Sequence, residues 1–128
     1  MDVSLLALGY CYLNAESKTS YFLKAVQWCR KYGLRINLDF HAFPGSQNGW
    51  NHSGRFGTIN ILKGPMGYAN AQRSLDLIRV VAEFASQPEY NSVIAMFGVM
   101  NEPRGPLIGQ DALSALYVLP GLCYYRYF

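Results

Sequence analysis

Apolar residues recur at steps of three and four in two stretches of the chain, and this is the spacing of one face of a helix. The first stretch, 21–32, stops at Gly33, and glycine readily takes the left-handed conformation that closes a helix. The second stretch, 70–87, stops before Pro88, whose ring cannot continue a helix. We therefore predict two amphipathic helices over these ranges.

Short apolar stretches stand between and before these helices, and their length is that of strands. We predict strands over 34–40 and 93–100, and a further strand that begins at Val3 and ends near Tyr10. Apolar residues fill 93–100 on both faces, which suits a parallel strand covered on both sides. Strands that alternate with helices indicate an α/β fold with a parallel sheet and right-handed crossovers. A doubly wound sheet and a barrel both fit this order.

The C-terminal residues follow the alternation less well. A short helix is predicted over 111–116, and Pro120 is expected to end it. The stretch 117–128 has neither helical period nor strand alternation, so we interpret it as an atypical tail. The 128 residues suffice for one core, and we expect a single domain over 1–128.

Composition excludes several classes of protein. Apolar residues make up 51% of the chain and charged residues 15%, which indicates a globular rather than a disordered protein. The net charge of +3 is not gathered into one basic stripe, so we expect no nucleic-acid partner. No apolar run reaches the roughly 20 residues that cross a bilayer, so we expect no membrane partner. The N-terminus has no convincing signal peptide, and the three cysteines show no metal spacing.

Candidate chemistry stands where the two internal strands end. Asp39 and His41 close the first of them, and Asn101 and Glu102 follow the second. The carboxyl ends of parallel strands are where ligands bind in α/β folds. Glu102 in that place can serve as a general acid, a base, a nucleophile or a metal ligand. The structural alternative is a turn in which the Asn and Glu side chains are only solvated.

The long stretch 42–67 between the first internal strand and the second helix is rich in Gly, Asn and Ser. A loop of this length inside a compact domain is usually functional. It carries Trp50, which can be a sugar platform or a cap over the core, and His52. A metal site would need Asp39 and His41 together with His52, and we expect no metal because this set has no further ligand.

Two motifs together resemble the fungal exo-1,3-β-glucanases of glycoside hydrolase family 5. They are RINLDFHAFPGSQNGWNHSG at Arg35–Gly54 and MFGVMNEP at Met96–Pro103. In that family a histidine precedes a Pro-Gly-Ser-Gln-Asn-Gly loop after one barrel strand, and Asn-Glu-Pro ends the next. The first motif is long and specific, whereas many barrel glycosidases share Asn-Glu-Pro. The resemblance runs over about 17–110.

The resemblance implies part of a (β/α)8 TIM barrel, roughly its second to fourth βα units, and retaining hydrolysis of β-1,3-glucan. It implies that Glu102 is the general acid/base and that Asn101 contacts the sugar near the reacting carbon. It also implies that His41 lines the glycone subsite and that Trp50 clamps the leaving-side sugar. The family often has another residue at the position of His52, which therefore receives no role. The resemblance implies no cofactor, and a location outside the cell or at the cell wall.

One half of the family's mechanism has no counterpart here. The family's nucleophile is a second glutamate on a later strand, in a Gly-Glu-Trp-like context, and the only acidic residue after Glu102 is Asp111. The arginine expected at the end of an earlier strand is also absent. We therefore expect a fragment that carries only the acid/base and is inactive alone. The alternatives are a non-catalytic carbohydrate-binding fragment, a fragment with no function of its own, and a metal-dependent hydrolase that uses Asp39, His41 and Glu102.

Overall fold

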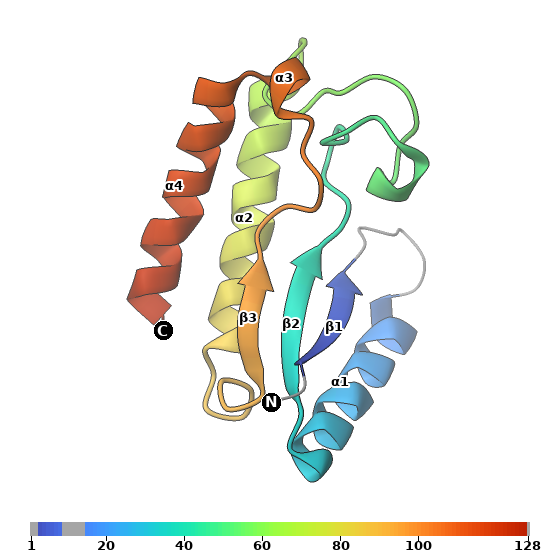
Figure 1. Cartoon of the computed structure of the whole chain (residues 1–128), viewed down its shortest axis with the longest axis vertical. Coiled ribbons are helices and arrows are strands. Elements are labelled where there is room, and N and C mark those ends of the chain that lie inside the picture. The colour runs from blue at the N-terminus through green and yellow to red at the C-terminus, as the bar shows by residue number, and fades with distance from the viewer. Residues whose placement is uncertain (1–2, 9–14, 128) are drawn as a thin grey trace.

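The computed structural model describes residues 3–8 and 15–127, and its centre is a sheet of three parallel strands (Figure 1). The strands lie in chain order: β1 (Val3–Leu8), β2 (Arg35–Phe40) and β3 (Ile94–Gly98). The central strand, β2, pairs with both neighbours. The α/β fold with a parallel sheet that the sequence predicts is therefore confirmed.

A helix follows each strand. α1 (Ala15–Tyr32) connects β1 to β2, and α2 (Gly67–Ala85) connects β2 to β3. After β3, the short α3 (Gly105–Ile108) leads into α4 (Gln110–Tyr127), which packs beside α2 (Figure 1). Among the described residues, none of these helices combines the length and the apolar character that a membrane span requires.

The two amphipathic helices extend further than the apolar pattern indicates. α1 begins at Ala15 rather than at residue 21. The prediction missed its first turns because they are polar and show no apolar period. α2 begins at Gly67, also before the predicted start. The closing residue of α1 is as predicted, since Gly33 has a φ of 71° in the left-handed region.

The prediction that Pro120 ends the last helix is wrong. α4 continues through Pro120 to Tyr127, so most of the stretch interpreted as an atypical tail is helical. A proline inside a helix removes one backbone hydrogen bond, and the residues on either side can still be helical. Leu113 and Leu116, which precede the proline, are buried in the core against α2 and hold the helix in place.

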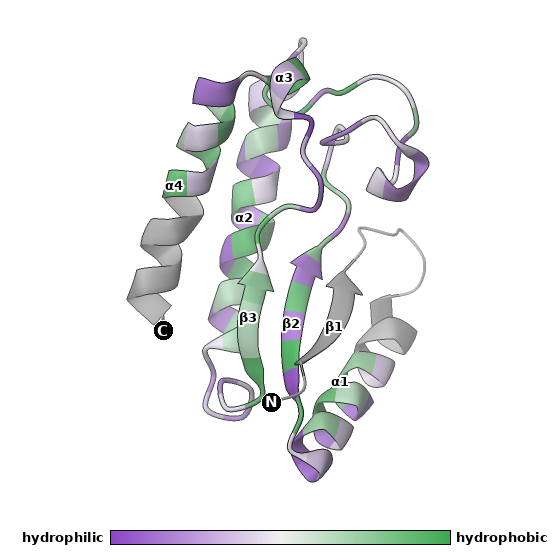
Figure 2. Cartoon of the chain, in the orientation of Figure 1, coloured by the Kyte–Doolittle hydropathy of each residue, from purple (hydrophilic) through white to green (hydrophobic). Residues whose placement is uncertain are grey.

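The core lies on the face of the sheet that α1 and α2 share. Hydrophobic and hydrophilic residues alternate along β2, and Ile36, Leu38 and Phe40 are the buried set (Figure 2). Val26 of α1 and Ala85 of α2 lie in one apolar cluster with Ile36 and Leu38. Because side chains of a strand point alternately to its two faces, both helices cover the same face of β2.

The opposite face of the sheet is more open. Asn37 of β2 stands there, and Met96 lies opposite Asn37 in the register and is 43% exposed. The prediction that the strand after α2 is covered on both faces is therefore wrong. The reason is that the described helices α1 and α2 pack on the other face.

Candidate active site

The loop between β2 and α2 folds back over the carboxyl ends of the strands. Its residues Ser46, Gln47 and Asn48 have no exposed surface, although all three are polar. Glycines allow this close approach: Gly49 has a φ of 77°, and a Cβ there would lie 2.3 Å from the Gly57 carbonyl oxygen. The motif Pro-Gly-Ser-Gln-Asn-Gly is thus a buried turn, with only a short 3-10 helix, Asn51–Ser53, after it.

Gln47 joins the two segments that follow β2 and β3. Its Nε2 donates to the carbonyl oxygen of His41 at 2.9 Å and to that of Asn101 at 3.0 Å. Its Oε1 accepts a hydrogen bond from the backbone N–H of Phe43 at 3.3 Å. One buried amide therefore fixes the distance between the two strand ends that carry the candidate catalytic residues.

Replacing Gln47 with alanine is expected to lower the free energy of unfolding by about 3 kcal/mol, because buried carbonyl groups lose their donor and a void remains. Urea unfolding followed by circular dichroism measures the change. Gln72→Ala is the matched control, since Gln72 is exposed on α2 and bonds only Asp76; its expected change is within about 0.5 kcal/mol. Equal midpoints for the two variants would contradict the role given to Gln47.

Glu102 stands on a strained backbone at the end of the second segment. Its φ is 46°, and a residue other than glycine is uncommon in this region and often found at functional sites. The Asn48 side chain donates from Nδ2 to the Glu102 carbonyl oxygen at 3.3 Å, which helps to hold this conformation. The Glu102 carboxylate itself is 57% exposed and open to a ligand.

His52 forms a hydrogen bond with that carboxylate. Its Nε2 lies 2.9 Å from Glu102 Oε2, and the same nitrogen is 3.4 Å from Asn48 Nδ2. When Glu102 is ionised, Nε2–H can donate to the carboxylate; when Glu102 is protonated, its O–H can donate to Nε2. A change of imidazole tautomer therefore gives Glu102 a hydrogen bond in both of its protonation states.

His41 is held from two sides. Its Nδ1 lies 2.8 Å from Asp39 Oδ2, and the Asp39 side chain is only 14% exposed. The Asp39 carboxylate accepts a hydrogen bond from Nδ1–H, and in that tautomer Nε2 can accept one from the Asn101 amide at 3.5 Å. This hydrogen bond places the Asp39 and His41 side chains on the same side of the chain at the end of β2.

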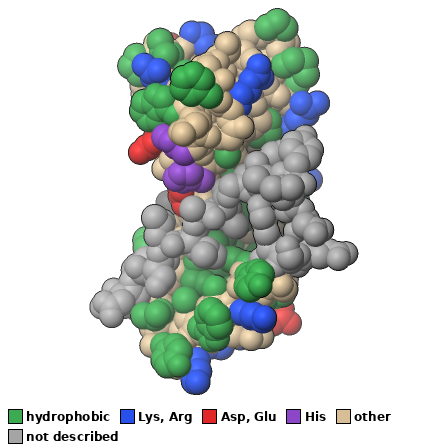
Figure 3. Space-filling view, turned by 90° about the vertical axis from the view of Figure 1, so that its right-hand side faces the viewer, with side chains coloured by type: hydrophobic (Ala, Val, Ile, Leu, Met, Phe, Trp, Pro, Cys, Tyr) green, Lys and Arg blue, Asp and Glu red, His purple; other side chains and the backbone are tan. Residues whose placement is uncertain are grey.

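The aromatic rings form a row beside the carboxylate. The His52 ring lies 5.7 Å from the His41 ring and 5.4 Å from the Trp50 ring, measured between centroids. The Arg104 guanidinium lies 5.6 Å from the centroid of Trp50. Figure 3 shows both histidines of the chain next to acidic side chains on one face of the molecule.

The structure thus brings together the four residues to which the resemblance gives roles: His41, Trp50, Asn101 and Glu102. Two further residues at this place, Gln47 and Asn48, were given no role by sequence reasoning, and His52 was considered only as a third metal ligand. Gln47 and Asn48 stand inside the quoted loop motif, and their position between two glycines is a signal that they occupy a tight, buried turn. The contact between His52 and Glu102 has no signal in the sequence, because 50 residues separate the two.

The site offers one open carboxylate. Asp39 is the other acidic residue at the described strand ends, and it is bound to His41. Among the described residues, no group of three or more His, Cys, Asp or Glu side chains is arranged to hold a metal ion. The chemistry that this arrangement supports is proton transfer by Glu102 to or from a ligand held by polar and aromatic side chains.

Fold and site together define part of an α/β protein whose polar groups, with one open carboxylate, gather at the carboxyl ends of parallel strands. In sequence, the chain is homologous to the fungal glucan 1,3-β-glucosidases, which confirms that resemblance. Probable glucan 1,3-beta-glucosidase D of Aspergillus flavus is 55% identical over 89 residues, and that of Aspergillus niger is 54% identical over 83.

The chain spans only a small part of these relatives. The match covers 70% of this chain and 11% of the Aspergillus flavus protein, and 65% and 10% for the Aspergillus niger protein. A crystal structure named AoRut superposes with a TM-score of 0.71 at 18% identity, over 94% of this chain and 39% of AoRut, and shows the fold. No protein-family model matches the chain.

Proposed function

We propose that this chain supplies the acid/base half of a retaining hydrolase of β-1,3-glucan. The observation that supports it most is the placement of Glu102, which is open to a ligand and lies beside His52, in a chain homologous to glucan 1,3-β-glucosidases. We assign the chain to glycoside hydrolase family 5 on the two motifs at Arg35–Gly54 and Met96–Pro103.

We further propose that the whole chain, 1–128, is one partial domain and that its three strands are roughly the second to fourth βα units of a (β/α)8 barrel. Two features support this. The strands are parallel and neighbour one another in chain order, and α1 and α2 cover the same face of the sheet. A doubly wound sheet would place helices on both faces, whereas a barrel places them all outside.

In the proposed reaction, the Glu102 carboxylic acid gives its proton to the glycosidic oxygen as the bond to the anomeric carbon breaks. A second glutamate, which has no counterpart in this sequence, forms an ester with that carbon. The Glu102 carboxylate then takes a proton from the water that attacks the same carbon, and the second glutamate leaves. Configuration is retained because the carbon is attacked twice.

The remaining residues would bind the sugar. Asn101 is proposed to donate to a sugar hydroxyl near the reacting carbon, and His41, oriented by Asp39, to line the glycone subsite. Trp50, 41% exposed, is proposed to clamp the leaving-side sugar. No cofactor takes part in this mechanism. Because the proposed substrate is a glucan, we also propose that the protein is located outside the cell or at the cell wall.

A graft tests this proposal. Residues 17–110, the range of the resemblance, replace the corresponding segment of the Aspergillus flavus relative, so that the rest of that protein supplies the missing strands. We expect the graft to hydrolyse laminarin and to release the β-anomer of the product first, as nuclear magnetic resonance of early products shows. Release of the α-anomer, or a folded graft without turnover, would argue against the retaining mechanism.

A non-catalytic carbohydrate-binding chain is the second candidate, because the exposed Trp50 stands among polar groups of the kind that bind sugars. This candidate predicts saturable laminarin binding with no turnover even in the graft.

A further inference from the structure

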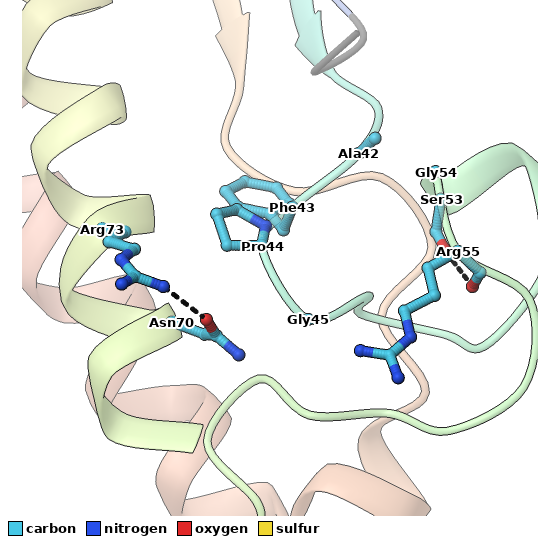
Figure 4. Close-up of a pocket in the computed structure, with 9 residues that line it drawn as sticks. All are labelled: Ala42, Phe43, Pro44, Gly45, Ser53, Gly54, Arg55, Asn70 and Arg73. Carbon is cyan, nitrogen blue, oxygen red and sulfur yellow. Dashed lines mark hydrogen bonds between the residues drawn. The ribbon is translucent and has the colours of Figure 1, made fainter. Parts of the chain in front are cut away.

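A pocket lies next to the loop that carries the candidate active site, and none of its lining residues belongs to that site. Its volume is about 430 Å³, within the range of small-molecule sites (Figure 4). The loop after β2 forms one part of its wall, the end of the 3-10 helix a second, and the first turns of α2 a third. Its lining residues are Ala42, Phe43, Pro44, Gly45, Ser53, Gly54, Arg55, Asn70 and Arg73.

The charge of this pocket is entirely positive. Arg55 and Arg73 are its charged lining residues, and among the residues that the structure describes no acidic one lines it. Arg73 donates to the Asn70 side-chain oxygen at 3.3 Å, and neither arginine forms an ion pair with a described residue. Most of the N–H donors of the two guanidinium groups therefore remain available.

Close packing and a buried hydrogen bond fix the wall of the pocket between the two arginines. Figure 4 shows Arg73 on α2 and Arg55 on the loop at opposite sides of the pocket, with Phe43 and Pro44 between them. Ser53, 1% exposed, bonds Ser46 through its hydroxyl at 2.6 Å. A Cβ on Gly45 would lie 2.5 Å from Asn70 Nδ2, so only glycine allows this packing of the loop on α2.

We propose that this pocket binds a small ligand that carries a carboxylate or a phosphate, with one guanidinium from each side of the pocket. Arginine presents N–H donors in a planar fork that matches both groups, and two uncompensated charges repel a cation and have little preference for a neutral sugar. The proposal does not rest on glucan hydrolysis, whose substrate is uncharged.

The midpoint of thermal unfolding of the 128-residue chain tests it, since a ligand of the folded state raises the midpoint in a saturable way. The ligands are inorganic phosphate and D-glucuronate, with D-glucose as the neutral comparison, all at one ionic strength so that screening is constant. We expect at least one of the two anions to raise the midpoint and D-glucose to leave it unchanged. A response to phosphate alone indicates a phosphate-bearing ligand, and one to glucuronate alone a carboxylate-bearing sugar.

Variants locate the effect. Arg55→Gln and Arg73→Gln should each weaken the apparent affinity about tenfold, and the double variant should lose the response. Arg79→Gln, further along α2 and paired with Glu83 at 3.9 Å, should keep it, as should Glu102→Gln, which separates this proposal from the proposed function. An equal response of the double variant, an equal effect of D-glucose, or the lack of any cooperative unfolding transition would overturn the proposal.

Discussion

Replacing Glu102 with glutamine in the grafted enzyme is expected to lower its turnover of laminarin by about 10²–10⁴-fold, the usual contribution of a general acid/base. The amide of glutamine has nearly the size of the carboxyl group, and its oxygen can still accept the His52 Nε2–H bond. It cannot give a proton to the glycosidic oxygen. Binding of laminarin, measured by titration calorimetry, should therefore change little while turnover is lost.

Two comparisons make this test specific. A β-glucoside with a strongly acidic phenol as its leaving group needs no proton to depart, so the variant should form its covalent intermediate at a nearly normal rate. Glu89→Gln is the matched control: Glu89 is exposed in the turn before β3, at the amino end of that strand rather than at its carboxyl end, and should leave turnover unchanged. Full laminarin turnover by the Glu102 variant would remove Glu102 from the mechanism.

The 128-residue chain by itself is expected to release no reducing sugar from laminarin above the buffer rate. A retaining mechanism needs a second carboxyl group about 5–5.5 Å from the first, and the other acidic residue at the described strand ends, Asp39, is bound to His41. Enzymes typically accelerate reactions by about 10⁶-fold or more, and a chain without the nucleophile should lose nearly all of this acceleration. Its turnover should therefore be undetectable.

The measurement is reducing-sugar release over several days, with the graft as the positive control. Circular dichroism on the same sample shows whether the chain is folded. Turnover by the chain comparable to that of the graft would contradict a mechanism that requires a later strand. Saturable laminarin binding by both the chain and the graft, with turnover by neither, would favour the carbohydrate-binding alternative.

The order of strands and helices could be predicted from the sequence because the helices and β2 have a clear period and the stretch that holds β3 is short and apolar. β2 alternates strictly, and Ile36, Leu38 and Phe40 are its buried residues. The residues at which the elements begin and end could not be predicted as well. α1 begins earlier than predicted where its residues are polar, and α4 passes through Pro120, because hydrogen bonds and packing of neighbouring turns outweigh the local preference of one residue.

The candidate site was predictable as a place but not as a set of contacts. A strand delivers the residue after it to a known edge of the sheet, so His41 and Glu102 could be placed there from chain order. Which side chain contacts Glu102 depends on how the loop folds over the strand ends. His52 and Gln47 reach partners 50 and 54 positions away, and no local pattern encodes such distances.

The sequence by itself determined the alternation of strands and helices, the parallel sheet and the likeness to glucan 1,3-β-glucosidases, since periodicity and motif spacing are local along the chain. Only the tertiary structure decided that both crossover helices lie on one face, that β3 is open at Met96, and that His52 bonds Glu102. It alone placed Arg55 and Arg73 across one pocket. The helix positions depend on the strand order of the sheet, and the contacts of the site and the pocket depend on the path of the loop after β2, which glycines and buried amides fix in three dimensions.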